Sequence, residues 1–292
     1  MLEFGKIVLF GVGLIGGSFA LALKKANAVE EIVGFSRSPN SLKIAQEIGI
    51  IDRAGINPAH EIADADVIMF ATPVQQIPMI LEKIFPYLKN PNTILTDVGS
   101  SKSEIVQQAR KIMKGKIGQF VPAHPIAGTE FSGPKAAFPE LFQNKKLVLT
   151  PLKENKDEFL DRIKLAWRIC GAEIFELDPE SHDTIFAGVS HLPHMLSFAL
   201  VADLANRENS NLFFEFAASG FRDFTRIAAS DAEMWRDICL SNRYTLIAEI
   251  AHFQVVLNNM MAALATNDKK MLEQIFSQAS QARNEWAKNK QK

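Results

Sequence analysis

The chain has 292 residues, more than one typical domain, so two domains are expected. Its composition, 47% hydrophobic and 22% charged, is that of a soluble protein with a substantial core. The formal net charge of -1 argues against a polybasic surface for nucleic acid or for an anionic membrane. The cysteines, Cys170 and Cys239, match no metal or redox spacing, which fits a reducing cytoplasm.

Two apolar stretches require a comparison with membrane and secretion signals. Residues 7–23 contain four glycines, and Lys24 and Lys25 separate them from the small residues that a signal peptidase would need. Residues 185–205 approach the length of a membrane span but contain two histidines, a proline and an aspartate. We interpret the first stretch as a buried strand and helix and the second as a buried helix, and we expect a soluble cytoplasmic protein.

In chain order, short β-rich runs alternate with amphipathic segments as far as residue 178. This alternation predicts an α/β domain over 1–178 with a doubly wound parallel sheet of Rossmann type. From Asp178-Pro179 onward the apolar residues recur at helical spacing, which predicts an all-α domain over 179–292 with a capping box at Ser230 and Glu233. The β-rich runs are 6–10, 31–35, 66–70, 93–97, 119–123, 146–150 and 173–177, and the helical patterns between them are 17–27, 41–48, 75–88, 101–113 and 156–170.

The first predicted strand leads into a glycine-rich turn, Gly11-x-Gly13-x-x-Gly16, that opens a helix. Gly11 permits the tight turn, Gly13 lets the backbone approach a pyrophosphate, and Gly16 allows close packing of helix and strand. The N–H groups of Leu14 and Ile15 would then face the phosphates at the positive end of the helix dipole. The pattern predicts a dinucleotide site, and the alternative is a plain glycine-rich turn.

The end of the second predicted strand indicates which dinucleotide is bound. An acidic residue here would bond the ribose 2'-hydroxyl of NAD, but the sequence has Ser36, Arg37 and Ser38. Because Arg37 can pair with a 2'-phosphate, we favour NADP over NAD, although Arg37 could also be a solvated surface arginine. Thr72 and Pro73, after the third run, are further candidates for cofactor contact.

His124 follows the fifth predicted strand, in the segment AHPIAGTE. The carboxyl ends of parallel strands share one edge of the sheet, so His124 is expected beside the dinucleotide. Oxidation of a hydroxyl needs a base there with a pKa near neutrality. A buried structural histidine is the alternative.

Five motifs occur in the order GVGLIGGS, DVGSSK, HPIAGTE, SHLPH and DFTRIAASDAEMWRDI. Together they resemble the prephenate/arogenate dehydrogenase family of tyrosine biosynthesis, from about residue 6 to residue 255. The first motif is shared by many dehydrogenases, whereas the last four together are specific. The family pairs a nucleotide-binding domain with a helical dimerisation domain, as in the division expected here. Many members have valine at the position of Ser101, a difference that we expect to be harmless.

The resemblance implies a role for each matching residue. His124 becomes the catalytic base, and Ser100 hydrogen-bonds both His124 and the substrate hydroxyl. Arg226 becomes the ligand of a substrate carboxylate, with Asp223 as a gating partner. The other residues that the resemblance places around the substrate are Thr129, Glu130, Ser190, His191 and His194.

These residues also have structural interpretations. His191 and His194 lack an evident third ligand, so no metal site is expected, and they could be hydrogen-bonded core residues. Arg226 could pair with a neighbouring aspartate, as could Arg222 and Arg236. A dicarboxylate substrate, which requires a fixed guanidinium fork, favours the binding role of Arg226.

The implied reaction is an NAD(P)-dependent oxidative decarboxylation of prephenate or arogenate to 4-hydroxyphenylpyruvate or tyrosine. The two substrates differ in a keto or an amino group, which the motifs do not distinguish. One alternative is a 3-hydroxyacid or imine-type dehydrogenase, although such enzymes usually use a lysine of the helical domain and none stands between Pro179 and Asn267. The other alternative is a dinucleotide-sensing regulator, which would leave HPIAGTE and DFTR without a purpose.

The predicted helical domain carries apolar residues on more than one face of 185–201, 212–218 and 244–265. A domain of this size has difficulty covering three such helices alone, so we expect an obligate homodimer through it. From the chain length we expect no appended regulatory or chorismate mutase domain, so any inhibition by tyrosine would be competitive at the active site.

Overall fold

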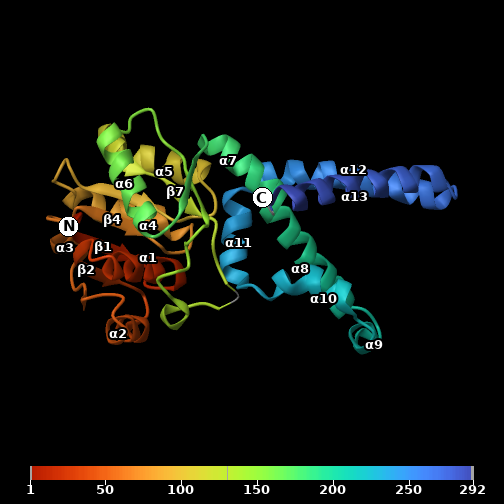
Figure 1. Ribbon diagram of the computed structural model, residues 1–292, viewed down its shortest axis with the longest axis horizontal. Helices are drawn as coiled ribbons and strands as arrows, with labels where there is room; N and C mark the ends of the chain where they lie inside the picture. Colours follow the sequence, from red (N-terminus) through yellow and green to blue (C-terminus); the bar gives the residue numbers. More distant parts are fainter. Residues whose placement is uncertain (1, 130, 291–292) are drawn as a thin grey trace. The chain divides into compact units, whose positions relative to one another are not determined.

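The computed structural model describes residues 2–129 and 131–290. They fall into two compact units, one that ends at Arg243 and one that begins at Tyr244. The first unit contains two β-sheets and their helices, together with the helical segments from residue 179 to residue 241 (Figure 1). The second contains the long helix α12 (Arg243–Ala265) from Tyr244 onward and the long helix α13 (Lys269–Lys290).

The main sheet has six parallel strands in the order β3-β2-β1-β4-β5-β6. Val8 of the central strand β1 pairs with Val33 of β2 on one side and Ile68 of β4 on the other. The chain therefore starts at the centre and winds outward in both directions, which confirms the predicted doubly wound α/β fold. The strands are β1 (Phe4–Phe10), β2 (Val29–Phe35), β3 (Arg53–Ala54), β4 (Val67–Phe70), β5 (Ile94–Asp97) and β6 (Phe120–Val121).

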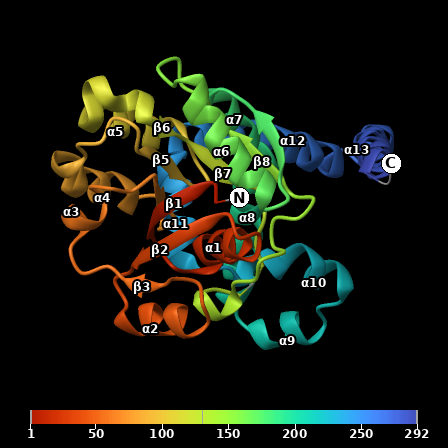
Figure 2. The same ribbon diagram turned by 60° about the vertical axis from the view of Figure 1, so that its left-hand side comes forward.

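Helices cover both faces of this sheet, because the strands are apolar on both sides (Figure 2). Helices α1 (Leu14–Lys25) and α6 (Asp157–Ile169) pack on one face through Phe19 and Trp167, whose ring centroids are 4.9 Å apart. Helices α4 (Gln76–Ile84) and α5 (Ser103–Met113) pack on the other face. Shorter helices at the periphery are α2 (Pro39–Glu47) and α3 (Pro58–Glu61).

The predicted parallel sheet is wrong in its last part, where a second sheet forms in the order β7-β8-β9. The run 119–123 is interrupted at Pro122, which has no N–H to continue the β5–β6 ladder. The chain then enters β7 (Ala123–Pro125), which pairs antiparallel with β8 (Lys146–Leu149), and β8 pairs parallel with β9 (Glu173–Glu176). His124 therefore follows the last strand of the main sheet, as expected, but it lies within the first strand of the second sheet.

The chain beyond Asp178 is helical in its described residues, as predicted. The predicted capping box is wrong, because Asp231 rather than Ser230 caps α11 and accepts the Met234 N–H at 2.7 Å. The Ser230 hydroxyl instead donates to the Ile227 carbonyl at 2.8 Å. The elements of the first unit beyond Asp178 are α7 (Pro179–Phe186), the π-helical turn η4 (Ala187–His191), α8 (Leu192–Ala205), α9 (Ser210–Glu215), α10 (Ser219–Thr225), η5 (Arg226–Ala229) and α11 (Ala232–Ser241).

Two helical stretches, Pro179–Ala205 and Arg243–Ala265, are long and apolar enough to span a membrane by length and composition alone. The expectation that 185–205 is a buried helix is wrong for the single chain, in which Val189 is 68% exposed. The buried side chains of the first stretch include polar ones, among them His182, Asp183 and His191. Polar groups inside the protein and apolar groups outside indicate that something further covers this surface.

Candidate active site

The glycine turn after β1 has the geometry of a phosphate-binding loop. Gly11 has φ +98°, and a Cβ there would lie 2.2 Å from the Ala71 carbonyl oxygen. At Gly16 a Cβ would lie 2.3 Å from the Gly11 carbonyl oxygen, so both positions require glycine for packing. A Cβ at Gly13 would meet nothing within 4 Å, so this backbone is open to a ligand. No side chain of the described residues caps α1, and its N-terminal N–H groups remain suited to an anion.

The neighbouring candidate residues lie at the same edge of the sheet. The Ser36 hydroxyl accepts the Ser38 N–H, and the Ser38 hydroxyl caps α2 by accepting the Ser41 N–H, both at 3.2 Å. Arg37 is exposed, and the structure gives its guanidinium no hydrogen bond or ion pair with a described residue. The Thr72 hydroxyl is buried without a partner among the described residues. The residues of this edge fit a dinucleotide.

His124 begins a chain of buried polar groups. Its Nδ1 lies 2.9 Å from His182 Nε2, and His182 Nδ1 lies 2.8 Å from Asp183 Oδ1. Phe186, one helical turn beyond His182, packs its ring 4.9 Å from the His124 ring. The hydrogen bonds connect β7 to α7, and thus the second sheet to the helical segment.

Asp183 also caps the N-terminus of α5. Its two carboxylate oxygens accept the backbone N–H groups of Lys102 at 2.7 Å and Ser103 at 2.8 Å. Burial raises the pKa of Asp183, but the hydrogen bonds from His182 and from these two N–H groups outweigh it and lower the pKa below its usual value. Asp183 is therefore a carboxylate at neutral pH.

A buried ion pair lies directly behind His124. The Lys102 ammonium donates to the Asp97 carboxylate and, at 2.8 Å, to the carbonyl oxygen of Ala123. Asp97 also accepts the Ala123 N–H at 3.2 Å. Burial lowers the pKa of Lys102, and the attraction of Asp97 opposes this shift. The pair holds both polar groups of the Ala123 backbone, so it fixes the start of the strand that carries His124.

The surroundings of His124 keep its imidazole neutral. Burial lowers its pKa well below 6.5, and unfavourable electrostatic interactions of a protonated His124 with His182, Lys102 and His191 lower it further. A neutral imidazole whose Nδ1 is engaged by His182 presents Nε2 for another hydrogen bond. It can therefore act as a base toward a hydroxyl group.

Ser100 and Ser101 occupy the loop between β5 and α5. Ser100 is half-buried, and its backbone opposes the fall of the His191 pKa. No hydrogen bond joins its side chain to His124 in the part of the chain that the structure describes, so the expected Ser100–His124 bond is not formed here. Ser101 is fully buried, and its hydroxyl lies 2.6 Å from that of Ser241 on α11. Serine at this position therefore forms a hydrogen bond to the helical segment that a valine could not form.

The SHLPH segment supplies two histidines with different surroundings. His191 is fully buried, its Nδ1 lies 3.2 Å from Asn242 Nδ2, and burial lowers its pKa to about 4. His194 donates from Nδ1 to the Ser190 carbonyl at 2.9 Å and stacks on Trp235 at 3.6 Å. The π-helical turn ends at His191, whereas His194 lies in the first turn of α8.

Arg226 differs from the two arginines that flank it in the sequence. Arg222 pairs with Asp223 at 3.5 Å, and Arg236 pairs with Asp237 at 2.6 Å. Among the described residues no carboxylate lies within ion-pairing distance of Arg226, whose charge lowers the pKa of His194 after the larger effect of burial. The arrangement offers a guanidinium and a histidine to an acidic ligand.

The HPIAGTE loop leaves β7 toward the surface. Thr129 is exposed, and its hydroxyl accepts the Phe131 N–H at 3.2 Å. The Glu130 position, which the resemblance also places in the pocket, lies outside the described residues.

Sequence reasoning did not identify Asp97, Lys102, His182 and Asp183 as parts of this site. Asp97 and Lys102 stand inside the quoted motif DVGSSK, so an ionisable pair at the end of an apolar strand was an available signal. His182 and Asp183 follow the cap and proline that start α7, where two adjacent ionisable residues precede an apolar helix. The contacts of His182 with His124 and of Asp183 with α5 join segments that are distant in the sequence, so no short sequence pattern predicts them.

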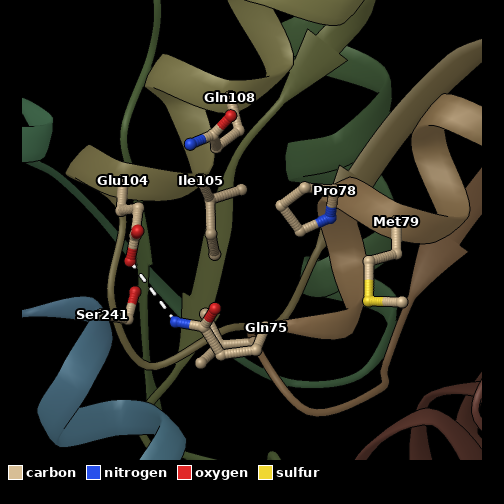
Figure 3. A pocket seen from close by; sticks show the side chains of 8 residues that line it. Gln75, Pro78, Met79, Glu104, Ile105, Gln108 and Ser241 are labelled. Atoms are coloured by element: carbon tan, nitrogen blue, oxygen red, sulfur yellow. Dashed lines mark hydrogen bonds between the residues drawn. The ribbon is translucent and has the colours of Figure 1, made fainter.

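A hollow of about 260 Å³ lies next to this cluster, between the N-terminal turns of α4 and α5 and Ser241 of α11 (Figure 3). Gln75 Nε2 lies 3.4 Å from a carboxylate oxygen of Glu104 across its mouth. Met79 and Ile105 line it with apolar atoms. None of the eight lining residues belongs to the His124 cluster, so the hollow is a separate feature of this edge.

Two family models match successive parts of the chain. The model described as "Prephenate dehydrogenase, nucleotide-binding domain" matches residues 19–176. The model described as "Prephenate dehydrogenase, dimerization domain" matches residues 178–278.

Individual proteins match over almost the whole chain. The prephenate dehydrogenase of Bacillus subtilis (strain 168) is 34% identical over 278 residues, which are 95% of this chain and 75% of that protein. The prephenate dehydrogenase of A. aeolicus, solved in complex with hydroxyphenyl propionate and NAD+, has a TM-score of 0.89 and 34% identity, covering 97% of this chain and 99% of that one. The arogenate dehydrogenase of Synechocystis has a TM-score of 0.80 and 30% identity, covering 96% and 99%.

Proposed function

We propose that this chain, which belongs to the prephenate dehydrogenase family, catalyses the oxidative decarboxylation of prephenate or arogenate with a nicotinamide dinucleotide. The observation that carries the proposal is the contact of His124 Nδ1 with His182, in surroundings that lower the pKa of His124, at the sheet edge that also holds the glycine turn. A half-buried base and a phosphate-binding loop at one edge are what hydride transfer from a hydroxyl requires.

In this proposal His124 takes the proton of the ring hydroxyl at Nε2. When bound, the oxidised nicotinamide supplies the acceptor for the hydride that leaves the same ring carbon. The dienone then loses its ring carboxylate as CO2, and the electron pair of the broken bond makes the ring aromatic. The reaction releases no net proton, so His124 can return its proton to the resulting phenolate oxygen. Ser100, half-buried in the loop beside this site, is proposed to hold the ring oxygen by a hydrogen bond from its hydroxyl.

Residues of the helical segment are proposed to bind the rest of the substrate. Arg226, which has no carboxylate partner among the described residues, would pair with a substrate carboxylate, as a guanidinium fork does. His194, stacked on Trp235, and the buried His191 would line the same pocket. For Ser190, Thr129, Glu130 and the gating role of Asp223, the proposal rests on their places in the matching motifs.

The chain uses a nicotinamide dinucleotide, and we propose that NADP serves at least as well as NAD. Support comes from the absence of a carboxylate at positions 36–38 and from the exposed, unpaired guanidinium of Arg37 within the described residues. Gly11, Gly13, Leu14, Ile15 and Gly16 are proposed to hold the pyrophosphate, with Thr72 and Pro73 beside it. Because Ser38 already caps α2, its contribution to a 2'-phosphate would be smaller than that of Ser36 or Arg37.

We further propose a cytoplasmic homodimer, with a nucleotide-binding domain over 1–178 and a substrate and dimerisation domain over 179–292. Exposed apolar side chains, including Phe216 at 81% and Leu264 at 67%, support a partner surface in the helical half. A second copy of the chain, rather than a membrane, is the proposed cover, because the matched dimerisation model spans the same helices.

The purified protein, incubated with prephenate or arogenate and each dinucleotide, should produce reduced nicotinamide and CO2 in equal amounts. Replacing His124 by Asn should leave cofactor affinity nearly unchanged and lower turnover by roughly 10² to 10⁴-fold, the contribution of a general base. Near-normal turnover of His124→Asn would assign His124 a structural role. Reduction of the dinucleotide by simple 3-hydroxyacids, without CO2, would instead favour the 3-hydroxyacid dehydrogenase alternative.

A further inference from the structure

The partner of His124 is itself a titratable and fully buried side chain. His182 is 0% exposed, and its ring lies with its centroid 5.1 Å from that of His124 at an angle of 62°. The two nitrogens in contact, His124 Nδ1 and His182 Nε2, are 2.9 Å apart. One of them must carry the hydrogen and the other the lone pair, so the direction of this bond decides the tautomer of His124.

Asp183 determines which group donates and which accepts in the hydrogen bonds that join it to His182 and His124. Its carboxylate oxygens face the backbone N–H groups of Lys102 and Ser103, and backbone N–H groups can only donate. Asp183 therefore accepts from every neighbour, including Nδ1 of His182 at 2.8 Å. With its hydrogen on Nδ1, neutral His182 has its lone pair on Nε2, and His124 must donate from Nδ1.

The Asp183 carboxylate, where these hydrogen bonds end, is held in place by the fold. Lys102 stands at the N-cap of α5 without a side-chain cap of its own, and Asp183 of α7 supplies the missing acceptors. The helix dipole favours a negative charge at this position. Asp178 caps the start of α7 in turn by accepting the Ser181 N–H at 2.8 Å. The N-termini of α5 and α7 thus hold the Asp183 carboxylate in place independently of His182 and His124.

We infer that His182 is a positioning residue that holds His124 with a hydrogen on Nδ1 and a lone pair on Nε2, in a direction imposed by Asp183. The inference rests on the proposed role of His124 as the base. It assigns the proton-accepting atom of His124 to Nε2. When Nε2 takes the substrate proton, the His124 cation still donates its Nδ1 hydrogen to His182. The Asp183 carboxylate then stabilises the positive charge through the two hydrogen bonds that join it to His124. The same logic orients the histidine of a serine protease triad.

The tautomer is measurable without any turnover. In protein labelled with 15N-histidine, the imidazole nitrogens of His124 should show a protonated Nδ1 and an unprotonated Nε2 at neutral pH. The His124 signals are assigned by their disappearance in His124→Asn. A hydrogen on Nε2 of His124 in the wild type would overturn the inference, whatever the activity of the enzyme.

Two substitutions separate positioning from packing. Glutamine at position 182 offers an amide oxygen as acceptor near the place of Nε2, whereas phenylalanine fills the space without an acceptor. We expect His182→Phe to lower kcat by at least about tenfold, with KM and cofactor affinity nearly unchanged and with mixed His124 tautomers. His182→Gln should recover most of this loss and the Nδ1 hydrogen. The exposed His60 on α3 provides matched controls, His60→Phe and His60→Gln, which should leave kcat unchanged.

Equal losses in His182→Phe and His182→Gln, with the wild-type tautomer of His124 retained in both, would overturn the inference and assign His182 to packing. Unchanged kcat in His182→Phe would also overturn it. If His182→Phe fails to fold, the tautomer of His124 in the wild type and in His182→Gln decides the question. A wild type inactive on both substrates would refute the proposed function. The nitrogen spectra would still show whether His124 donates from Nδ1 to His182.

Discussion

The neutral state of His124 determines how the enzyme should respond to acid. Burial and unfavourable electrostatic interactions with His182, Lys102 and His191 hold its pKa well below 6.5. A base must be unprotonated to act, so kcat/KM should stay level as the pH falls toward 6.5 and decline only at lower pH, as His124 gains a proton. A pH profile of kcat/KM measures this directly. An acid limb with its midpoint above pH 7 would contradict the described surroundings of His124.

We expect cofactor choice to depend on the residues just after β2. A carboxylate introduced by Ser36→Asp would repel a 2'-phosphate and accept hydrogen bonds from a ribose 2'-hydroxyl. We expect this change to shift the ratio of kcat/KM values toward NAD by roughly tenfold, the value of about one charge-assisted hydrogen bond. Arg37→Ala should weaken NADP alone, and Lys43→Ala, on the exposed face of α2, is a matched loss of charge. A wild type that prefers NAD by about tenfold or more would contradict the NADP proposal.

The limits of sequence reasoning are visible at individual residues. His124 could be placed at the sheet edge because strand ends and motif spacing are local features. Its partner His182 is 58 residues away, and the Ser101–Ser241 pair joins residues 140 apart. Such contacts depend on how α7 and α11 pack near α5, and no pattern within either segment specifies that packing. The same holds for Asp183, whose role as a cap for α5 appears only once two helix starts meet.

At the level of elements, the β1–α1 turn allows a matched comparison between its glycines. Gly13 has φ -80° and open space at its Cβ, so Gly13→Ala should fold with a stability within about 0.5 kcal/mol of wild type. If the pyrophosphate binds at Gly13 as proposed, the added methyl group would obstruct it, so dinucleotide affinity should fall by at least about tenfold.

Gly11→Ala provides the contrast, because its φ of +98° and its 2.2 Å approach to the Ala71 carbonyl oxygen leave no room for a Cβ. This variant should be destabilised by roughly 1 to 3 kcal/mol or fail to fold. Chemical denaturation of the two variants tests the predicted stabilities, and dinucleotide titration tests the predicted loss of affinity. Normal dinucleotide affinity in a folded Gly13→Ala would remove this turn from the cofactor site.

The element pattern was predictable where periodicity alone defines an element. The alternation of apolar runs and amphipathic segments indicated the main sheet and its helices, because a strand buried on both faces is apolar throughout. The second sheet was missed because the runs that contain β7, β8 and β9 alternate with helical or loop segments in the same way as the runs of the parallel strands. Only the interruption at Pro122 and the antiparallel register of His124 with Val148 distinguish them, and register depends on tertiary contacts.

At the scale of the whole molecule, the apolar surface of the helical half predicts that activity depends on dimerisation. On α12 alone, Ile247, Met261 and Leu264 are each more than 60% exposed. An obligate interface of the expected kind buries about 2,000 Å² or more and is strongly apolar, so a charge at its core is costly. The variant Leu264→Glu should therefore shift the protein from dimer to monomer at micromolar concentration. Ile56→Glu places the same charge on an apolar residue of the first half that is 94% exposed, and it should leave the dimer intact.

Light scattering combined with an activity assay over a range of concentrations separates the outcomes for Leu264→Glu. His191, His194 and Arg226 belong to the half of the chain matched by the dimerisation model, so we expect the monomer to lose substrate affinity and to recover it as concentration restores the dimer. Dinucleotide binding, for which we propose the glycine turn of the first half, should change little in the same samples. A monomeric Leu264→Glu with full activity would contradict the dependence of the site on the dimer, whereas a dimeric Leu264→Glu would place the interface elsewhere on the helical half.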